Sequence, residues 1–147
     1  MRSALVVLGQ FGSIAVLLFG GGWQMPWWAW VLFAFGLAVF AWAVASLGGN
    51  NFTILPDPRS ANTLSERGVY RWLRHPMYTA VLLCGSAVSF GAPSMARWTA
   101  LGVCVVVLVI KVHYEEALLT ARHPDYPQRM KGVARLCPCL LYTSRCV

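Results

Sequence analysis

Long stretches without a charged residue constrain this chain more than any other feature of its sequence. No residue is charged from Ala4 to Gly22, and none is charged from Trp27 to Leu47. A helix needs about 20 apolar residues to cross a hydrocarbon core that is about 30 Å thick. Because backbone polar groups inside a bilayer must be paired within the chain, both stretches are expected to be helical. They therefore predict two membrane-spanning helices that form a tight hairpin.

A second pair of uncharged stretches predicts a second, less regular hairpin. Met77 to Ala96 is uncharged, and so is Trp98 to Ile110, with a turn expected at Gly91 to Ser94. The last stretch has only about 13 residues, so we expect a helix that starts in lipid and continues into water through roughly Ala121. The expected fold is all-α, a polytopic membrane helical bundle with about four transmembrane helices.

The placement of charged residues orients this expected bundle. Cytoplasmic loops near the ends of spans are enriched in Lys and Arg. If both termini are cytoplasmic, only Arg97 of the twelve basic residues lies outside, and all five acidic residues lie inside. We therefore expect both termini and any polar functional site on the cytoplasmic face, of the inner or plasma membrane if the source is bacterial. Orientation and anionic lipid headgroups explain the net charge of +7, so we expect no nucleic-acid partner.

The segment from Gly68 to Tyr78 is a candidate functional joint between two helices. Arg74, His75 and Pro76 place a permanent cation, a titratable imidazole and a backbone stop next to one another. Proline keeps the preceding residue out of the helical conformation and suits the first turn of the next helix. The spare amide groups of a helix N-terminus beside two basic side chains favour an anion site.

A short amphipathic helix is expected just before this joint. Thr63 and Glu66 have the spacing of a capping box, which marks the start of a helix. A helix that begins there and runs toward Arg74 would present Arg67, Arg71 and Arg74 on one basic face.

Glu115 and Glu116 are the only adjacent carboxylates, and they follow the fourth uncharged stretch. Neighbouring residues on a helix point about 100° apart, so one glutamate can face a site while the other faces water. A carboxylate this close to hydrocarbon is costly without a partner or a function, which makes Glu116 the strongest candidate. A simpler interpretation is that Glu115 only pairs with Lys111, four residues earlier.

A cytosol-facing site built from Arg74, His75, Tyr78 and Glu116 suits a ligand that carries both charges. S-adenosylmethionine has an α-carboxylate for cations and helix amides, and an α-ammonium for a glutamate. Its sulfonium suits an aromatic face such as that of Tyr70 or Tyr78. The chain contains no glycine-rich Rossmann motif that would bind the cofactor in another way.

Two motifs in a defined order carry a family resemblance. They are Gly68-x-Tyr70-x-x-x-Arg74-His75-Pro76-x-Tyr78 and Glu115-Glu116-x-x-Leu119. Together with residues from roughly 50 to 138, this order resembles the isoprenylcysteine carboxyl methyltransferase family and its phospholipid N-methyltransferase relatives. The resemblance implies a helical membrane enzyme that uses S-adenosylmethionine and takes a lipophilic acceptor from the bilayer. The cofactor site that it implies consists of Tyr70, Arg74, His75, Pro76, Tyr78, Glu115 and Glu116.

Specific roles follow from this resemblance and from the chemistry of methyl transfer. Catalytic roles are expected for Arg74 and Glu116, and substrate binding for Arg71 and Tyr126. A carboxylate acceptor needs no base, whereas an amine or thiol acceptor benefits from one, such as His75 or a glutamate. Carboxyl O-methylation of a prenylcysteine-like substrate is the expected reaction. Methylation of a phospholipid amine or a small thiol stays open, as does a non-enzymatic small membrane subunit.

Residues 1–138 are expected to form a single integral membrane methyltransferase domain. The segment from Cys139 to Ser144 reads CLLYTS, which matches one translated frame of a common transposon-end sequencing adapter. We therefore expect residues 139–147 to be non-native. No metal site is expected, because Cys137-Pro-Cys139 lacks the C-x-x-C spacing and has no partner pair.

Overall fold

The computed structural model describes residues 2–47 and 67–136, with side chains from residue 5 onward. This part contains four longer helices, namely α1 (Arg2–Phe19), α2 (Trp27–Leu47), α3 (Pro76–Gly91) and α4 (Met95–Arg122). Two short helical turns complete it, η1 (Gly68–Arg71) and α5 (Tyr126–Arg129). Apart from one isolated parallel β-bridge, between Leu73 and Ala134, the described residues are helical or irregular. The all-α expectation is therefore confirmed for these residues.

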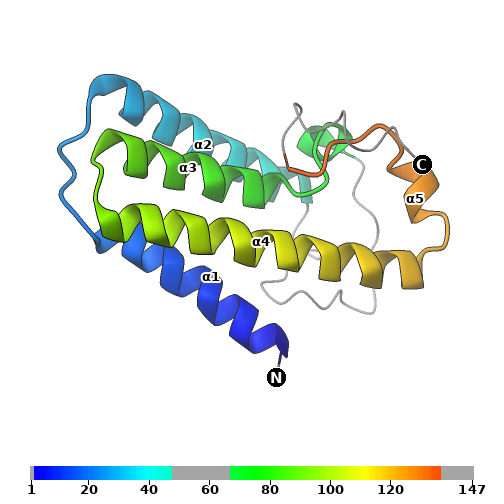
Figure 1. Cartoon of the computed structure of the whole chain (residues 1–147). Helices are drawn as coiled ribbons and strands as arrows, with labels where there is room; N and C mark the ends of the chain where they lie inside the picture. Colours follow the sequence, from blue (N-terminus) through cyan, green and yellow to red (C-terminus); the bar gives the residue numbers. More distant parts are fainter. Residues whose placement is uncertain (1, 48–66, 137–147) are drawn as a thin grey trace.

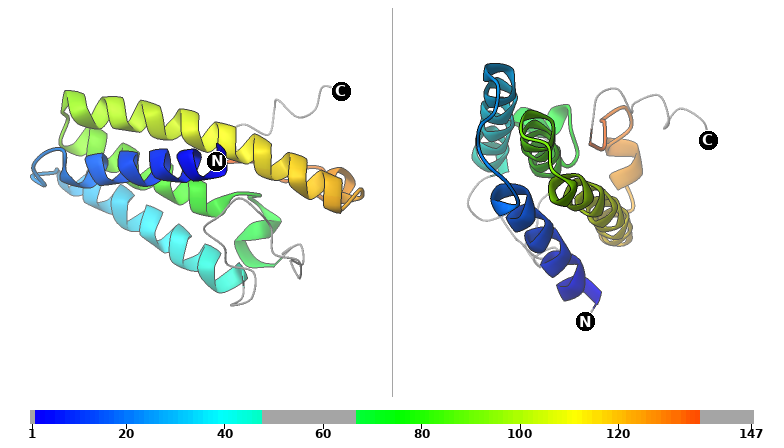
Figure 2. Two further views of the ribbon diagram at one scale, coloured as in Figure 1. Left: turned by 90° about the horizontal axis from the view of Figure 1, so that it is seen from below. Right: turned by 60° about the vertical axis from the view of Figure 1, so that its left-hand side comes forward.

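The four longer helices run back and forth as two hairpins (Figure 1). α2 packs along α3, α1 packs along α4, and α3 and α4 are neighbours (Figures 1 and 2). α1 and α2 are joined by a short connection but do not pack along each other, so the tight hairpin expected for them is wrong. Both hairpin connections lie at one end of the molecule, while η1 and α5 lie at the other. The polar joint is thereby placed at the end of the bundle opposite the hairpin turns.

Two helices, α2 and α4, are long and apolar enough to cross a membrane. The 16-residue α3 and the stretch Leu5–Phe19 of α1 are also apolar but shorter. Large apolar side chains such as Leu8, Phe35 and Val106 are exposed on the outside of the bundle. Exposed apolar surface of this kind indicates contact with a membrane or a partner. The structure thus supports a helical membrane protein with two candidate spans.

Small residues allow α2 to approach α3 closely. The buried positions of α2 are Ala29, Gly36 and Ala43, spaced seven residues apart on one face. A methyl group on Gly36 would lie only 2.6 Å from Sγ of Cys84, which is closer than real contacts allow. Interfaces between membrane helices commonly use small residues in this way, because they let the two backbones come together.

The fourth helix extends well beyond the last uncharged stretch. Ser94 caps the N-terminus of α4, since its Oγ accepts a hydrogen bond from the amide of Arg97 at 3.2 Å. The helix then continues for 28 residues and ends at Arg122. The expectation of a helix that continues through roughly Ala121 is therefore confirmed, and Glu115 and Glu116 lie near its end.

A buried arginine joins the two hairpins at the end away from η1. Arg97 is 0% exposed, and its guanidinium donates to four backbone carbonyls at 2.8 to 3.1 Å, those of Leu17, Gly21, Gly22 and Ala92. These carbonyls lie at or just beyond the ends of α1 and α3, where helices leave carbonyl groups unpaired and partly negative. The sequence indicated only that Arg97 lies on the outer side, and its clamping role is visible only in the structure.

The joint before α3 has the conformation that proline imposes. Pro76 is buried in the first turn of α3, and His75 before it has a non-helical backbone with φ −126° and ψ 62°. This part of the prediction is confirmed. Gly68 has a φ of +57°, a conformation that only glycine adopts readily, and a side chain there would collide with Ser46.

The predicted amphipathic helix running to Arg74 is wrong within the described residues. η1 is a four-residue 3-10 turn, after which the chain at Leu73 pairs with Ala134 instead of continuing a helix. Arg67 and Arg71 are exposed whereas Arg74 is largely buried, so the three arginines do not share one face. The backbone of Leu73 pairs with Ala134, after α5, in place of forming the helical hydrogen bonds that local preference favours. The proposed capping box, the Cys137-Pro-Cys139 motif and the adapter-like tail lie outside the described residues.

Candidate active site

The candidate site forms where the joint before α3 meets the segment after α5. The amide of Arg74 donates to the carbonyl of Ala134 at 2.8 Å, and the amide of His75 donates to that of Arg135 at 3.1 Å. A small apolar cluster lies under this pairing, formed by Ala43, Val69, Leu73 and Ala134. Residues far apart in the sequence are thus fixed next to Arg74 and His75.

The guanidinium of Arg74 is fixed by three partners. Its Nε donates to the carbonyl of Val133 at 3.0 Å, and its Nη2 donates to that of Met130 at 2.7 Å. Its Nη1 donates to Oε1 of Glu116 at 3.2 Å. Because a planar group with three directed contacts has one orientation, Arg74 holds Glu116 and the segment after α5 in a defined arrangement.

Glu116 has a cation beside each of its carboxylate oxygens. Arg74 pairs with Oε1, and Nε of Arg135 lies 3.0 Å from Oε2. The side chain of Arg135 is 52% exposed, so it covers the glutamate from the solvent side. Arg135 was not among the site residues predicted from the sequence. Its position within the resembling region was the only available signal, because a basic residue in a basic tail is not distinctive by itself.

Glu115 is held by α3 and the joint. Oη of Tyr78 donates to Oε1 of Glu115 at 2.5 Å, and Nδ1 of His75 lies 3.5 Å from Oε2. The rings of His75 and Tyr78 stack with centroids 5.5 Å apart and planes 6° apart. Both glutamates therefore face the joint, and the interpretation in which one of them faces water is wrong. The imidazole of His75 lies between the two carboxylates, with Nδ1 near Glu115 and Nε2 near Glu116.

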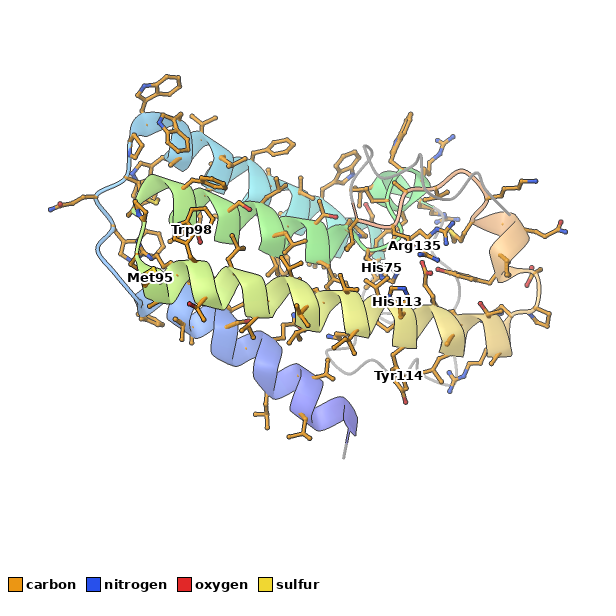
Figure 3. All side chains as sticks on the ribbon, viewed as in Figure 1. His75, Met95, Trp98, His113, Tyr114 and Arg135 are labelled. Atoms are coloured by element: carbon orange, nitrogen blue, oxygen red, sulfur yellow. The ribbon has the colours of Figure 1, made fainter. Side chains whose placement is uncertain are left out.

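One ring nitrogen of His75 has no hydrogen-bond partner. Nε2 lies 3.6 Å from Oε1 of Glu116, which is longer than a hydrogen bond, and this buried atom is unpaired within the described part of the chain. Figure 3 shows His75 close to Arg135, at the end of the bundle away from Met95 and Trp98. Buried polar atoms without a hydrogen bond are rare in folded proteins, so this nitrogen is the candidate contact for a ligand group.

A second polar group lies one helical turn deeper along α4. Lys111 is only 4% exposed, and its Nζ donates to Oε1 of the buried Gln10 in α1 at 2.9 Å. The same Nζ lies 5.0 Å from the centre of the Tyr78 ring, within the range of a cation–π interaction. From the sequence, Lys111 was expected only as a partner of Glu115. Its position at the edge of an apolar stretch could have indicated further partners, because a charge there requires stabilisation.

The other predicted site residues differ in how close they lie to the glutamates. Burial, and then the charge of Glu115, raises the pKa of Tyr70 to about 12. Burial, and then the charge of Glu116, likewise raises the pKa of Tyr126 to about 12. Both phenols are therefore neutral hydrogen-bond donors at neutral pH. Arg71 is exposed, and no ion pair connects it to the residues that the structure describes.

The fold and the site define a helical membrane protein in which carboxylates, arginines and a histidine converge at one end of the bundle. A family model described as phospholipid methyltransferase matches residues 25–125. The chain belongs to the phospholipid methyltransferase family, which makes it a membrane methyltransferase. No match was found among curated proteins or among solved structures.

The family match separates the site into a matched and an unmatched part. α2, α3 and α4 lie within the matched residues, together with the joint and both glutamates. α1 and α5 lie outside it, and so do Gln10, Tyr126 and Arg135. The match confirms the broader resemblance, to phospholipid methyltransferases. The narrower resemblance, to the isoprenylcysteine carboxyl methyltransferases, stays a prediction.

Proposed function

We propose that this chain is an S-adenosylmethionine-dependent methyltransferase that acts on a lipophilic acceptor. The observation that carries the proposal is the buried, unpaired Nε2 of His75, which lies between Glu115 and Glu116 and beside Arg74. A site with both charges in place, and with one unsatisfied polar atom at its centre, suits a ligand that is itself a zwitterion. The family membership supports methyl transfer as the reaction.

The side chains present fit the polar end of S-adenosylmethionine. Glu115 and Glu116 are the proposed partners of its ammonium group, and Arg74 is the proposed partner of its carboxylate. In the structure these groups pair with each other, so a zwitterion can replace part of that pairing without leaving a buried charge alone. The proposed cofactor-binding set is Tyr70, Arg74, His75, Pro76, Tyr78, Glu115 and Glu116.

Of the two aromatic rings considered for the sulfonium, Tyr70 is the better placed. The ring of Tyr78 already stacks on His75 and has the ammonium of Lys111 over it. Tyr70 is half-buried, and its pKa is raised first by burial and then by the charge of Glu115. A cation that approaches Tyr70 would therefore also be attracted by Glu115.

The cofactor supplies an activated methyl group when it is bound. The task of the chain is then to align the acceptor and exclude water, because methyl transfer is an in-line displacement. Arg74 and Glu116, for which we propose catalytic roles, hold the joint and α4 in register through their 3.2 Å pair. For an amine or thiol acceptor, Nε2 of His75 is the proposed proton acceptor, since it makes no hydrogen bond in the described residues.

For the acceptor we propose first a prenylcysteine-like carboxylate. All three guanidinium nitrogens of Arg74 have partners, so the exposed Arg71 and the half-exposed Arg135 are better placed to bind an acceptor carboxylate. Tyr126 is buried beside Glu116 and is the proposed phenol donor to the substrate. The family description names phospholipids, which favours a phospholipid amine as the second candidate.

We propose four spans, with both termini and the site in the cytoplasm. In support, both hairpin turns lie at the end of the bundle opposite the joint. The long α4 brings Glu115 and Glu116 to the same end as the joint, where the predicted cytoplasmic loops carry nearly all the basic residues. A lipophilic acceptor would reach this end along the bilayer.

Titration calorimetry with S-adenosylhomocysteine tests this proposal on the detergent-purified chain. The wild-type protein is expected to bind, and Glu116→Gln and His75→Ala are each expected to weaken binding at least about tenfold, or about 1.4 kcal/mol. Asp125→Asn is the matched control, because it removes an exposed carboxylate that pairs only with the exposed Arg129 in the described residues.

The possible results separate the function from the site. Absence of binding by the wild type would refute the methyltransferase proposal, and unchanged affinity in both site variants would refute the site. A labelled-methyl assay with prenylcysteine, aminophospholipid and thiol acceptors then separates the acceptor classes. Methyl incorporation into the aminophospholipid alone would replace our first acceptor with the second.

A further inference from the structure

A continuous polar chain runs from the interior of α1 to the glutamates of the site. It begins at Gln10, whose Oε1 accepts a hydrogen bond from Nζ of Lys111 at 2.9 Å. Lys111 lies against the ring of Tyr78 at 5.0 Å, and Tyr78 donates to Glu115 at 2.5 Å. The chain ends at Nδ1 of His75, 3.5 Å from the other oxygen of Glu115.

Each of these polar groups is costly where it lies unless its neighbours stabilise it. Gln10 and Lys111 are 8% and 4% exposed and come from helices with mainly apolar side chains. A buried amide or ammonium is tolerated only with hydrogen bonds or an opposite charge nearby. Replacing both by apolar residues would remove this cost, so their presence suggests a task other than stability.

This series of polar side chains restrains the orientation of the Tyr78 ring. A phenol can rotate about its side-chain bonds, and in the observed orientation its hydroxyl donates to Glu115. The ammonium of Lys111 on the ring, and the imidazole of His75 stacked on it, both favour that position. Lys111 itself has a long flexible side chain, and the hydrogen bond to Gln10 limits its movement.

We propose that Gln10 and Lys111 are positioning residues, through which α1 holds the Tyr78–Glu115 half of the methyl-donor site in place. They act through Tyr78 and are not themselves assigned a contact with cofactor or acceptor. α1 lies outside the residues that match the family model, and Gln10 gives this helix a role beyond anchoring in the membrane. The positioning role rests on the site proposed above, but its first test does not require a ligand.

The first test is a fluorine NMR spectrum of the full chain labelled with 3-fluorotyrosine. The chain has five tyrosines, and Tyr78→Phe assigns the signal of interest. Gln10→Leu removes the acceptor for Lys111 at similar side-chain size, and Gln10→Glu keeps an acceptor oxygen. We expect the Tyr78 signal to shift in Gln10→Leu and to stay near its wild-type position in Gln10→Glu.

Ser13→Ala is the matched control within α1. Ser13 is also buried, and its Oγ donates to the carbonyl of Gln10 at 2.8 Å, so this variant disturbs the same helix without removing the acceptor of Lys111. Lys111→Met provides a second background that removes a buried charge and is expected to fold. In that background, adding Gln10→Leu should produce no further shift, because the connecting residue is already absent.

The second test is the affinity for S-adenosylhomocysteine of the same variants. Gln10→Leu and Lys111→Met are each expected to lose about tenfold, and the double variant should lose no more than Lys111→Met alone. An unmoved Tyr78 signal in Gln10→Leu would overturn the proposal, as would an equal shift in Ser13→Ala. If the wild type binds no S-adenosylhomocysteine, the proposed function fails while the NMR result still decides the positioning role.

Discussion

Arg74 and Glu116 are 42 positions apart in the sequence, and their side chains pair at 3.2 Å. The pair connects the joint before α3 to the last turns of α4. Through its contacts with Met130 and Val133, Arg74 also holds the segment after α5. One side chain thereby brings together three parts of the chain that form the site.

Arg74→Lys is expected to weaken this connection although it keeps the charge. An ammonium cannot reproduce the fixed fork of a guanidinium, so lysine would retain only part of the three contacts. We expect a loss of about 1–3 kcal/mol in the free energy of unfolding, measured by denaturant titration in detergent. Arg71→Lys is the control, since Arg71 is exposed. If Arg74→Lys and the wild type have the same free energy of unfolding, the three contacts of the guanidinium do not contribute to stability.

Arg97→Met is expected to destabilise the bundle without changing the site. Methionine matches the apolar stem of arginine but leaves the carbonyls of Leu17, Gly21, Gly22 and Ala92 without this donor. We expect a loss of about 3 kcal/mol or more, seen as a lower melting temperature. The affinity for S-adenosylhomocysteine below that temperature should be unchanged, because Arg97 lies at the opposite end. Arg71→Met, at an exposed position in η1, should melt like the wild type.

The raised pKa values of Tyr70 and Tyr126 predict a loss of stability in alkaline solution. Both rise from 10.0 to about 12 on folding, so the unfolded chain releases these protons first. The contribution of the two protonated phenols to the free energy of unfolding is complete below pH 10 and is lost as the pH rises toward about 12. Tyr70→Phe and Tyr126→Phe should each flatten this decline, measured as melting temperature against pH. A decline of the same slope in both variants would contradict the assignment.

The four-span proposal predicts opposite accessibility for two exposed glutamines. Gln24 lies in the α1–α2 connection and Gln128 lies in α5, at opposite ends of the molecule. In a variant without the native cysteines, Gln24→Cys should react with an impermeant maleimide added outside intact cells. Gln128→Cys should react only after permeabilisation. Reaction of both from the same side would exclude this topology.

Local chemistry explains the parts of the molecule that sequence reasoning predicted well. The length of an uncharged run decides whether a helix can span a membrane, and this predicted α2. The long α4 was predicted because no helix-breaking residue interrupts the sequence from Trp98 to about Ala121. The geometry of proline is equally local, so Pro76 predicted the start of α3 and the non-helical His75. The residue types of the site were also identifiable, because Arg74, His75 and the two glutamates stand out against an apolar chain.

The sequence by itself therefore determined the four longer helices, the proline joint and the residue types of the candidate site. The tertiary structure decided which groups meet: Gln10 with Lys111, Arg135 with Glu116, and Arg97 with the turns of both hairpins. It also replaced the expected helix before Arg74 by a 3-10 turn and a backbone pairing with Ala134. These contacts depend on how each helix is rotated and how closely it packs. Spacing along one segment contains no information about a partner that lies a hundred residues away.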